Sequence, residues 1–110
     1  MRQEDNMDTH DWHFCATTDS ITPNKITEVL AGEKHVCLLR KDDKLFAFVA
    51  TCPHAGGRLC EGWIDAMGRI VCPEHKYRFN PANGYNTSGE GYKLKTYPVK
   101  EEEGRIFVQF

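Results

Sequence analysis

The sequence lacks both a surplus of basic residues and a long apolar run. Lys and Arg number 14 against 16 Asp and Glu, which gives a formal charge of −2, whereas nucleic-acid binding needs clustered positive charge. The apolar runs fall far short of the roughly 20 residues that cross a bilayer. Residues 1–10 are polar and hold no apolar segment of a secretory signal. These absences predict a soluble, cytoplasmic protein that binds neither nucleic acid nor membranes.

Helical periodicity, internal repeats and linkers are absent as well. Apolar and polar residues alternate in short segments bounded by turn residues, which is typical of antiparallel strands. The chain has 110 residues, 40% of them apolar, which suits one domain over 1–110 with one core. We therefore expect an all-β fold, a small antiparallel sandwich or barrel. Strands are predicted over 12–17, 25–30, 35–41, 44–51, 63–64, 69–72, 77–79, 93–99 and 105–110, after a frayed polar segment at 1–11.

Two loops near the middle of the chain, 52–62 and 73–76, interrupt this pattern of strands. The first begins with Cys52 and contains His54, and the second follows Cys72 and contains His75. Seventeen residues separate a C-x-H motif from a C-x-x-H motif, a spacing that random composition would rarely produce. Each loop thus offers one thiolate and one imidazole, which are ligands that suit iron–sulfur clusters, zinc and copper. The pair of motifs predicts a metal site.

The cysteine count supports a metal site over a disulfide scaffold. Five cysteines is an odd number, and in a reducing cytosol cysteines near histidines more often bind metal. Zinc also accepts two thiolates and two imidazoles, but its usual pairing puts like ligands on each arm. The other three cysteines are expected to be packed thiols rather than ligands; they are Cys15, Cys37 and Cys60.

These residues resemble the Rieske family of 2Fe–2S proteins. The resemblance implies a Rieske fold with a cluster-binding subdomain at about 51–84, and a cluster held by Cys52, His54, Cys72 and His75. Two thiolates would balance the charge of two ferric ions and two sulfides, so histidine ligation makes reduction easier than in a four-thiolate cluster. The match covers 52–57 (CPHAGG), 72–79 (CPEHKYRF), 83–84 (NG), 94–99 (LKTYPV) and 105–108 (RIFV).

The same comparison indicates the low-potential branch of the family. High-potential members join their two loops by a disulfide, at positions that correspond to Gly57 and Glu74 here. They also place serine and tyrosine hydroxyls against the cluster, where this chain has Tyr77 and Phe79. Each missing donor removes stabilisation from the more negative reduced state. We expect a potential near the low end of the Rieske range, about −150 mV rather than about +300 mV.

Two residues depart from the pattern of Rieske ferredoxins. Lys76 follows the second histidine, where many members have glycine, and a positive φ there would strain a lysine. Glu74 adds a carboxylate between two proposed ligands, which lowers the potential further. The resemblance implies an electron carrier without its own catalytic site, working between a flavin reductase and a terminal oxygenase or reductase. The alternatives are the small subunit of an NAD(P)H-dependent nitrite reductase and a zinc-stabilised binding module.

Overall fold

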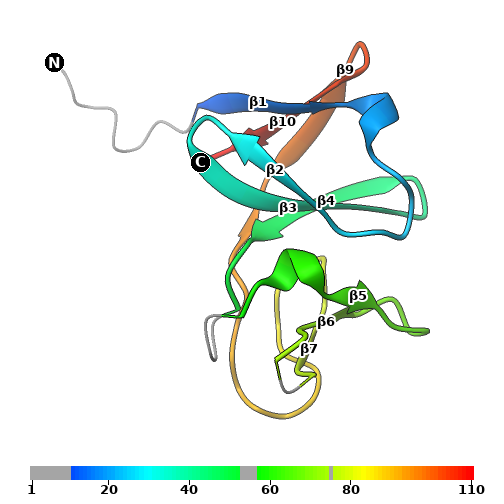
Figure 1. Cartoon of the computed structure of the whole chain (residues 1–110), viewed down its shortest axis with the longest axis vertical. Coiled ribbons are helices and arrows are strands. Elements are labelled where there is room, and N and C mark those ends of the chain that lie inside the picture. The colour runs from blue at the N-terminus through cyan, green and yellow to red at the C-terminus, as the bar shows by residue number, and fades with distance from the viewer. Residues whose placement is uncertain (1–10, 53–56, 75) are drawn as a thin grey trace, which may run out of the picture.

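The computed structural model describes residues 11–52, 57–74 and 76–110. Over these residues the chain forms three antiparallel sheets that are stacked along the long axis of the molecule (Figure 1). The predicted all-β class is confirmed. The helical segments among the described residues are two 3-10 turns, η1 (Thr18–Ser20) and η2 (Leu59–Glu61), and none of the described helices is long and apolar enough to cross a membrane.

The first sheet brings the two ends of the described chain together. Its strand order is β1 (Trp12–Thr17), β10 (Arg105–Gln109) and β9 (Val99–Glu102). Alternate residues of β10 are buried, with Ile106 and Val108 at 0% exposure, which is the period-2 pattern of a sheet with one covered face. This covered face packs on the neighbouring central sheet in one apolar cluster.

The central sheet is buried on both faces. Its order is β2 (Thr27–Ala31), β3 (Lys34–Lys41), β4 (Lys44–Val49) and β8 (Thr96–Tyr97). In β3 the side chains alternate between two cores: Val36 and Leu38 join the cluster under the first sheet, while Cys37 and Leu39 join a second cluster on the opposite face. A strand covered on both sides needs an unbroken apolar run, and these four residues supply it.

The third sheet is small and carries one of the two ligand loops. It consists of β5 (Trp63–Ile64), β6 (Ile70–Val71) and β7 (Arg78–Phe79). Cys52 follows the end of β4 by three residues, and Cys72 follows β6 directly. The second apolar cluster joins this sheet to the central one, so both cysteines lie where the two sheets meet. Figure 1 shows this region at the end of the molecule opposite the first sheet.

The predicted strands are found in the structure, except that one of them is divided into two strands. The predicted strand 93–99 is instead two strands, β8 and β9, separated by Pro98. Proline has no N–H to donate to a sheet, and the chain changes sheets there: β8 pairs with β4, and β9 pairs with β10. Most other boundaries move by one or two residues, because they depend on pairing partners that are distant in the sequence.

Candidate metal centre

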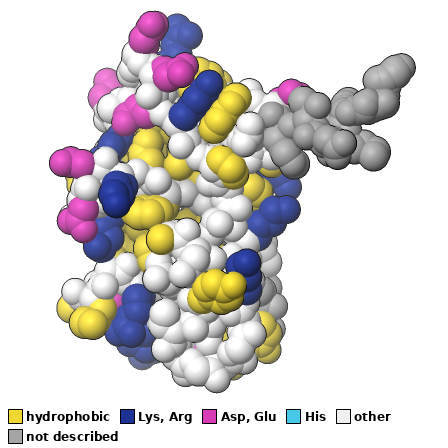
Figure 2. All heavy atoms as spheres, turned by 180° about the vertical axis from the view of Figure 1, so that it is seen from behind, with side chains coloured by type: hydrophobic (Ala, Val, Ile, Leu, Met, Phe, Trp, Pro, Cys, Tyr) yellow, Lys and Arg dark blue, Asp and Glu magenta, His cyan; other side chains and the backbone are white. Residues whose placement is uncertain are grey.

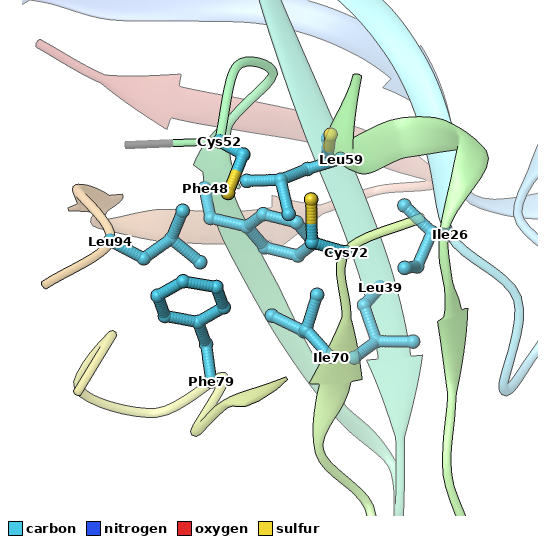
Figure 3. Packing of buried hydrophobic residues seen from close by; sticks show 10 residues of the cluster. Ile26, Leu39, Phe48, Cys52, Leu59, Ile70, Cys72, Phe79 and Leu94 are labelled. Carbon is cyan, nitrogen blue, oxygen red and sulfur yellow. The ribbon is translucent and has the colours of Figure 1, made fainter. Parts of the chain in front are cut away.

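Two of the four predicted ligands, Cys52 and Cys72, meet inside the second apolar cluster. Their residues are 1% and 0% exposed, and the two thiols are in hydrogen-bonding contact. Figure 3 shows their side chains projecting from separate segments into the same cluster, next to Phe48 and Leu59. His54 and His75 lie outside the described residues. The structure therefore brings together the two thiols that the sequence motifs predicted as ligands.

The two loops are closed by the same backbone hydrogen bond. The Cys52 N–H donates to the Gly57 carbonyl at 2.7 Å, and the Cys72 N–H donates to the Tyr77 carbonyl at 2.9 Å. In both cases the cysteine N–H reaches the residue five positions ahead, so each cysteine lies at the base of a short, closed loop. The first loop is braced further by the Leu59 N–H, which donates to the Ala50 carbonyl at 2.8 Å.

The environment of Cys72 keeps its thiol protonated until a metal displaces the proton. Burial is the main cause that raises the pKa of Cys72 to about 11, although a backbone hydrogen bond from Glu74 lowers it. The hydrogen bond with Cys52 and the charges of Cys52 and Glu74 also raise this pKa. A thiolate is the metal-binding form, so loading of the site releases protons. The donor chemistry fits a 2Fe–2S group, because two buried thiolates supply two negative charges in apolar surroundings.

The two loops touch where high-potential Rieske proteins carry their disulfide. A Cβ added to Gly57 would overlap the Glu74 side chain and would lie 3.4 Å from the Cys72 sulfur. The first loop therefore reaches the second loop through a residue without a side chain. Glycine at this position permits the close approach, and the Glu74 side chain fills the space beside it. The two loops pack without a covalent link at these positions.

Lys76 has the positive φ that would strain a lysine at this position. Its φ is +59°, which lies in the left-handed region that glycine tolerates without cost and lysine does not. The strained residue lies immediately before Tyr77, whose carbonyl accepts the hydrogen bond that closes the second loop. Closure of this loop therefore holds Lys76 in an unfavourable conformation.

A partly buried carboxylate, Asp65, organises the hairpin that leads to Cys72. Asp65 accepts hydrogen bonds from the backbone N–H groups of Met67 and Arg69, both at 2.9 Å. It also accepts from the guanidinium groups of Arg69 and Arg78, both at 3.1 Å. Since Arg78 lies on β7, one side chain ties together the β5–β6 turn and the strand after the second loop. No local sequence pattern marks the contact with Arg78, because strand pairing within the third sheet brings Arg78 to Asp65.

The pKa of Asp65 reflects this network. Burial alone raises it, but the backbone hydrogen bonds from Arg69 and Met67, the Arg69 charge and the Arg78 hydrogen bond together lower it below its ordinary value. The charged carboxylate is thus favoured in the folded protein, as expected for a carboxylate with several donors.

The other three cysteines are not alike. Cys37 and Cys60 form a disulfide, so the prediction that both are thiols is wrong. Cys15 is a half-buried thiol, as predicted, and burial raises its pKa to about 11. No local sequence signal marks the disulfide, because it joins β3 to a turn that is 23 residues away.

The aromatic residues around the loops divide between core and surface. Phe79 is fully buried in the second cluster, and Tyr77 packs against that cluster. The Tyr77 ring lies 5.8 Å from the ring of Tyr92. Trp63, however, is 46% exposed and lies at the surface rather than in the core.

The three glutamates at 101–103, at the end of β9 and in the turn that follows it, lie away from the two cysteines. Glu101 on β9 pairs with Arg40 at 2.6 Å and accepts a hydrogen bond from Thr18 at 2.5 Å. These contacts hold the first sheet against β3. Figure 2 shows the acidic side chains of that face gathered mainly over the half of the molecule away from the third sheet. Glu101 therefore braces the first sheet at a distance from the site.

Comparison with known proteins identifies the family. The model of the Rieske [2Fe-2S] domain matches residues 11–98, so this chain belongs to the Rieske [2Fe–2S] domain family, which is named for the cluster that it carries. The resemblance carried by the two loop motifs is confirmed. Since the family binds an iron–sulfur cluster, the zinc-module alternative loses its support.

Several curated relatives are ferredoxin components of oxygenase systems. The chain is 28% identical over 102 residues to that of the naphthalene 1,2-dioxygenase/salicylate 5-hydroxylase systems of Ralstonia sp., covering 92% of this chain and 97% of the relative. It is 29% identical over 77 residues to that of the alkene monooxygenase system of Xanthobacter autotrophicus, covering 70% of this chain and 63% of the relative. It spans only 23% of another relative, the cholesterol 7-desaturase of Bombyx mori, which is 31% identical over 104 residues and matches 88% of this chain.

Solved structures agree with this assignment. The ferredoxin of carbazole 1,9a-dioxygenase from Nocardioides aromaticivorans has a TM-score of 0.81 and 27% identity, covering 88% of this chain and 95% of that one. A ferredoxin in complex with reduced oxygenase in carbazole 1,9a-dioxygenase has a TM-score of 0.78 and 29% identity, over 88% and 91%. A putative NADH-dependent nitrite reductase small subunit from Mycobacterium tuberculosis has a TM-score of 0.81 and 25% identity, over 92% and 96%.

The Asp65 network predicts a pH-dependent loss of stability. The pKa of Asp65 is lower in the folded protein than in the unfolded chain. Its contribution to the free energy of unfolding is therefore complete above the ordinary carboxyl pKa, about 4. That contribution is lost as the pH falls through the lowered pKa. We expect Asp65→Asn to reduce the free energy of unfolding by roughly 1–3 kcal/mol at pH 7, and by less at pH 2–3. Urea unfolding at several pH values measures this. Asp43→Asn, at an exposed turn, is the control, and a D65N deficit that stays constant with pH would contradict the account.

The conformation of Lys76 predicts that glycine is stabilising at this position. Replacing Lys76 by glycine removes the clash that a Cβ makes in the left-handed conformation, which costs about 1 kcal/mol. Part of this gain is offset, because glycine adds backbone entropy to the unfolded chain. We expect Lys76→Gly to raise the free energy of unfolding in urea, and Lys76→Ala, which loses the charge but keeps the Cβ, to give no gain. Equal gains in both variants would show that charge rather than φ is responsible.

Proposed function

We propose that this chain is a Rieske ferredoxin component that carries single electrons to a terminal oxygenase. One observation carries the proposal: two loops, each closed by a cysteine N–H to the carbonyl five residues ahead, bring Cys52 and Cys72 into contact in a buried apolar cluster. Each loop also contains one histidine, His54 or His75. We propose that the two cysteines hold one iron of a 2Fe–2S cluster and the two histidines hold the other.

The bound cluster would accept and release one electron, and the chain's own residues set how easily it does so. Phe48, Leu59 and Phe79 surround the cysteines with apolar side chains, which excludes water and strengthens nearby charges. The negative charge of Glu74, in the second loop, raises the pKa of Cys72, although less than burial does. The same field opposes the added negative charge of reduction. Together with the missing disulfide at Gly57 and Glu74, it supports a potential near the low end of the Rieske range, about −150 mV.

The proposed partners are a terminal oxygenase and a flavin-containing reductase. The oxygenase is supported by a similar ferredoxin that forms a complex with the oxygenase of carbazole 1,9a-dioxygenase, and by relatives that are ferredoxin components of such systems. The reductase is inferred from the need of such a carrier for an electron source. A cytoplasmic location is part of the same proposal.

A second candidate is the small subunit of an NADH-dependent nitrite reductase. It rests on the fold shared with the putative small subunit from Mycobacterium tuberculosis. The complete set of two cysteines and two histidines favours the ferredoxin, because members of the nitrite reductase group often lack part of the set. Purification of the tagged chain from its own cells separates the two: a copurifying large subunit with flavin and sirohaem would establish the second candidate.

Removal of single ligands tests the proposed site. Protein purified without oxygen is expected to be red-brown, with visible absorption that is partly bleached by one electron per chain. Cys52→Ser, His54→Ala, Cys72→Ser and His75→Ala are each expected to abolish or strongly change this spectrum, because each removes one ligand. Cys15→Ser is the matched control and should leave it unchanged. A colourless protein with stoichiometric zinc, or normal spectra in the histidine variants, would contradict the assignment.

Electron delivery is the other half of the test. NADH with the flavin reductase of a Rieske dioxygenase system should reduce the wild-type protein, and the reduced protein should then reduce an oxidised Rieske oxygenase. Stopped-flow absorbance measures both steps. A protein that holds the cluster but is reduced by neither reductase nor dithionite would not be an electron carrier.

A further inference from the structure

The disulfide between Cys37 and Cys60 joins the central sheet to the segment that follows the first ligand loop. Cys37 lies on β3, Cys60 lies in η2, and their Cα atoms are 5.5 Å apart. Cys37 is fully buried, whereas Cys60 is partly exposed. The bond therefore has one end in the core and one end within reach of a reductant.

This bond anchors the far end of the loop that begins at Cys52. The near end is continuous with β4, which is paired with β3. The far end returns through Leu59, which is fully buried in the same cluster as Cys52 and whose N–H donates to the Ala50 carbonyl. Cys60 follows directly, so the disulfide fixes this returning segment to β3. Both ends of the first loop are thus attached to one strand, one by pairing and one by a covalent bond.

The other attachments of the returning segment are weak. Arg58 forms ion pairs with Glu28 on β2 and with Glu61, but the side chains of Arg58 and Glu61 are 57% and 65% exposed. Exposed ion pairs contribute little. Within the described part of the chain, the disulfide is therefore the strongest tie between η2 and the central sheet.

The position of the bond distinguishes it from the disulfide of high-potential Rieske proteins. That bond joins the two loops at the positions of Gly57 and Glu74, whereas this one leaves the loops unlinked and ties the first loop to the sheet beneath it. Inside cells disulfides are uncommon, and those that occur are usually transient or redox-sensing. A partly exposed bond beside a metal-binding loop matches that description.

We propose that the Cys37–Cys60 bond is a reversible thiol switch that controls how firmly the first loop retains the cluster. A protein dithiol of the thioredoxin class attacks the Cys60 sulfur, forming a mixed disulfide and releasing the Cys37 sulfur, which takes up a proton. The second thiol of the reductant then resolves the mixed disulfide. Two electrons and two protons pass to this chain, which gains two thiols, and the reductant becomes a disulfide.

Reduction would loosen the segment that positions Cys52. The returning segment would then be held by packing of Leu59, by the Leu59 hydrogen bond to Ala50, by the Thr51–Arg58 bridge and by the Arg58–Glu28 ion pair. Loss of outer-shell groups that hold metal ligands in place typically costs roughly 10–100-fold in metal affinity. We therefore expect the cluster to be lost about tenfold faster from the reduced form. This consequence depends on the proposed function, because it requires the cluster, whereas the existence and reduction of the bond do not.

The first experiment tests the bond itself. Cluster-free protein prepared with chelator and without reductant is unfolded and alkylated, and its mass is expected to show three modified cysteines: Cys15, Cys52 and Cys72. Native protein treated first with thioredoxin, its reductase and NADPH should show five. Hydrogen exchange over 57–63 should then become faster, while exchange in β10 stays unchanged. Five modified cysteines before reduction, or three afterwards, would overturn the switch.

The second experiment tests control of the cluster. Loss of visible absorption in the presence of chelator is followed for the wild type, for thioredoxin-reduced wild type and for Cys37→Ser/Cys60→Ser. The last two should lose the cluster about tenfold faster than the oxidised wild type, and reoxidation should restore the slow rate only in the wild type. Cys15→Ser is the control and should match the wild type. Loss rates within twofold of each other would overturn the proposal.

The two experiments separate this proposal from the proposed function. If the protein binds no cluster but shows three and then five modified cysteines, the ferredoxin assignment fails, and the control of cluster retention fails with it. If the cluster is present and the serine variant retains it as firmly as the wild type, only the switch fails.

Discussion

The site depends on one constraint that both loops share: a cysteine N–H must donate to the carbonyl five residues ahead. This bond closes each loop at its base and fixes the cysteine backbone, at Cys52 through Gly57 and at Cys72 through Tyr77. Both cysteines are then buried in one apolar cluster, where their thiols meet. The strained backbone of Lys76 is a consequence of this closure, since the chain must turn sharply to bring the Tyr77 carbonyl back.

The central sheet makes this arrangement possible. Its strand β3 is buried on both faces, so one strand supports the first sheet on one side and the ligand-bearing loops on the other. The loops are secured to this support by different means: the first by strand continuity and the Cys37–Cys60 bond, and the second by the Asp65 hydrogen bonds to the β5–β6 turn and β7. The positions of the two cysteines therefore depend on the central sheet and on the contacts that secure each loop to its neighbours.

The sequence was sufficient for features that local residue patterns encode. Period-2 alternation predicted most strands, and the two Cys–His motifs predicted which thiols would meet. It was insufficient where the answer depends on partners distant in the chain. Pro98 changes the sheet to which the chain belongs, Cys37 finds Cys60 across 23 residues, and Asp65 finds Arg78 through strand pairing.

The central claim is that one iron is held by two cysteines and the other by two histidines. Electron–nuclear double resonance on the one-electron-reduced protein, together with its 15N-histidine-labelled form, tests this most directly. The account predicts a rhombic signal whose average g value lies below that of a four-thiolate cluster, with couplings to two histidine nitrogens that change on labelling. A signal with the four-thiolate average and no histidine coupling would contradict it.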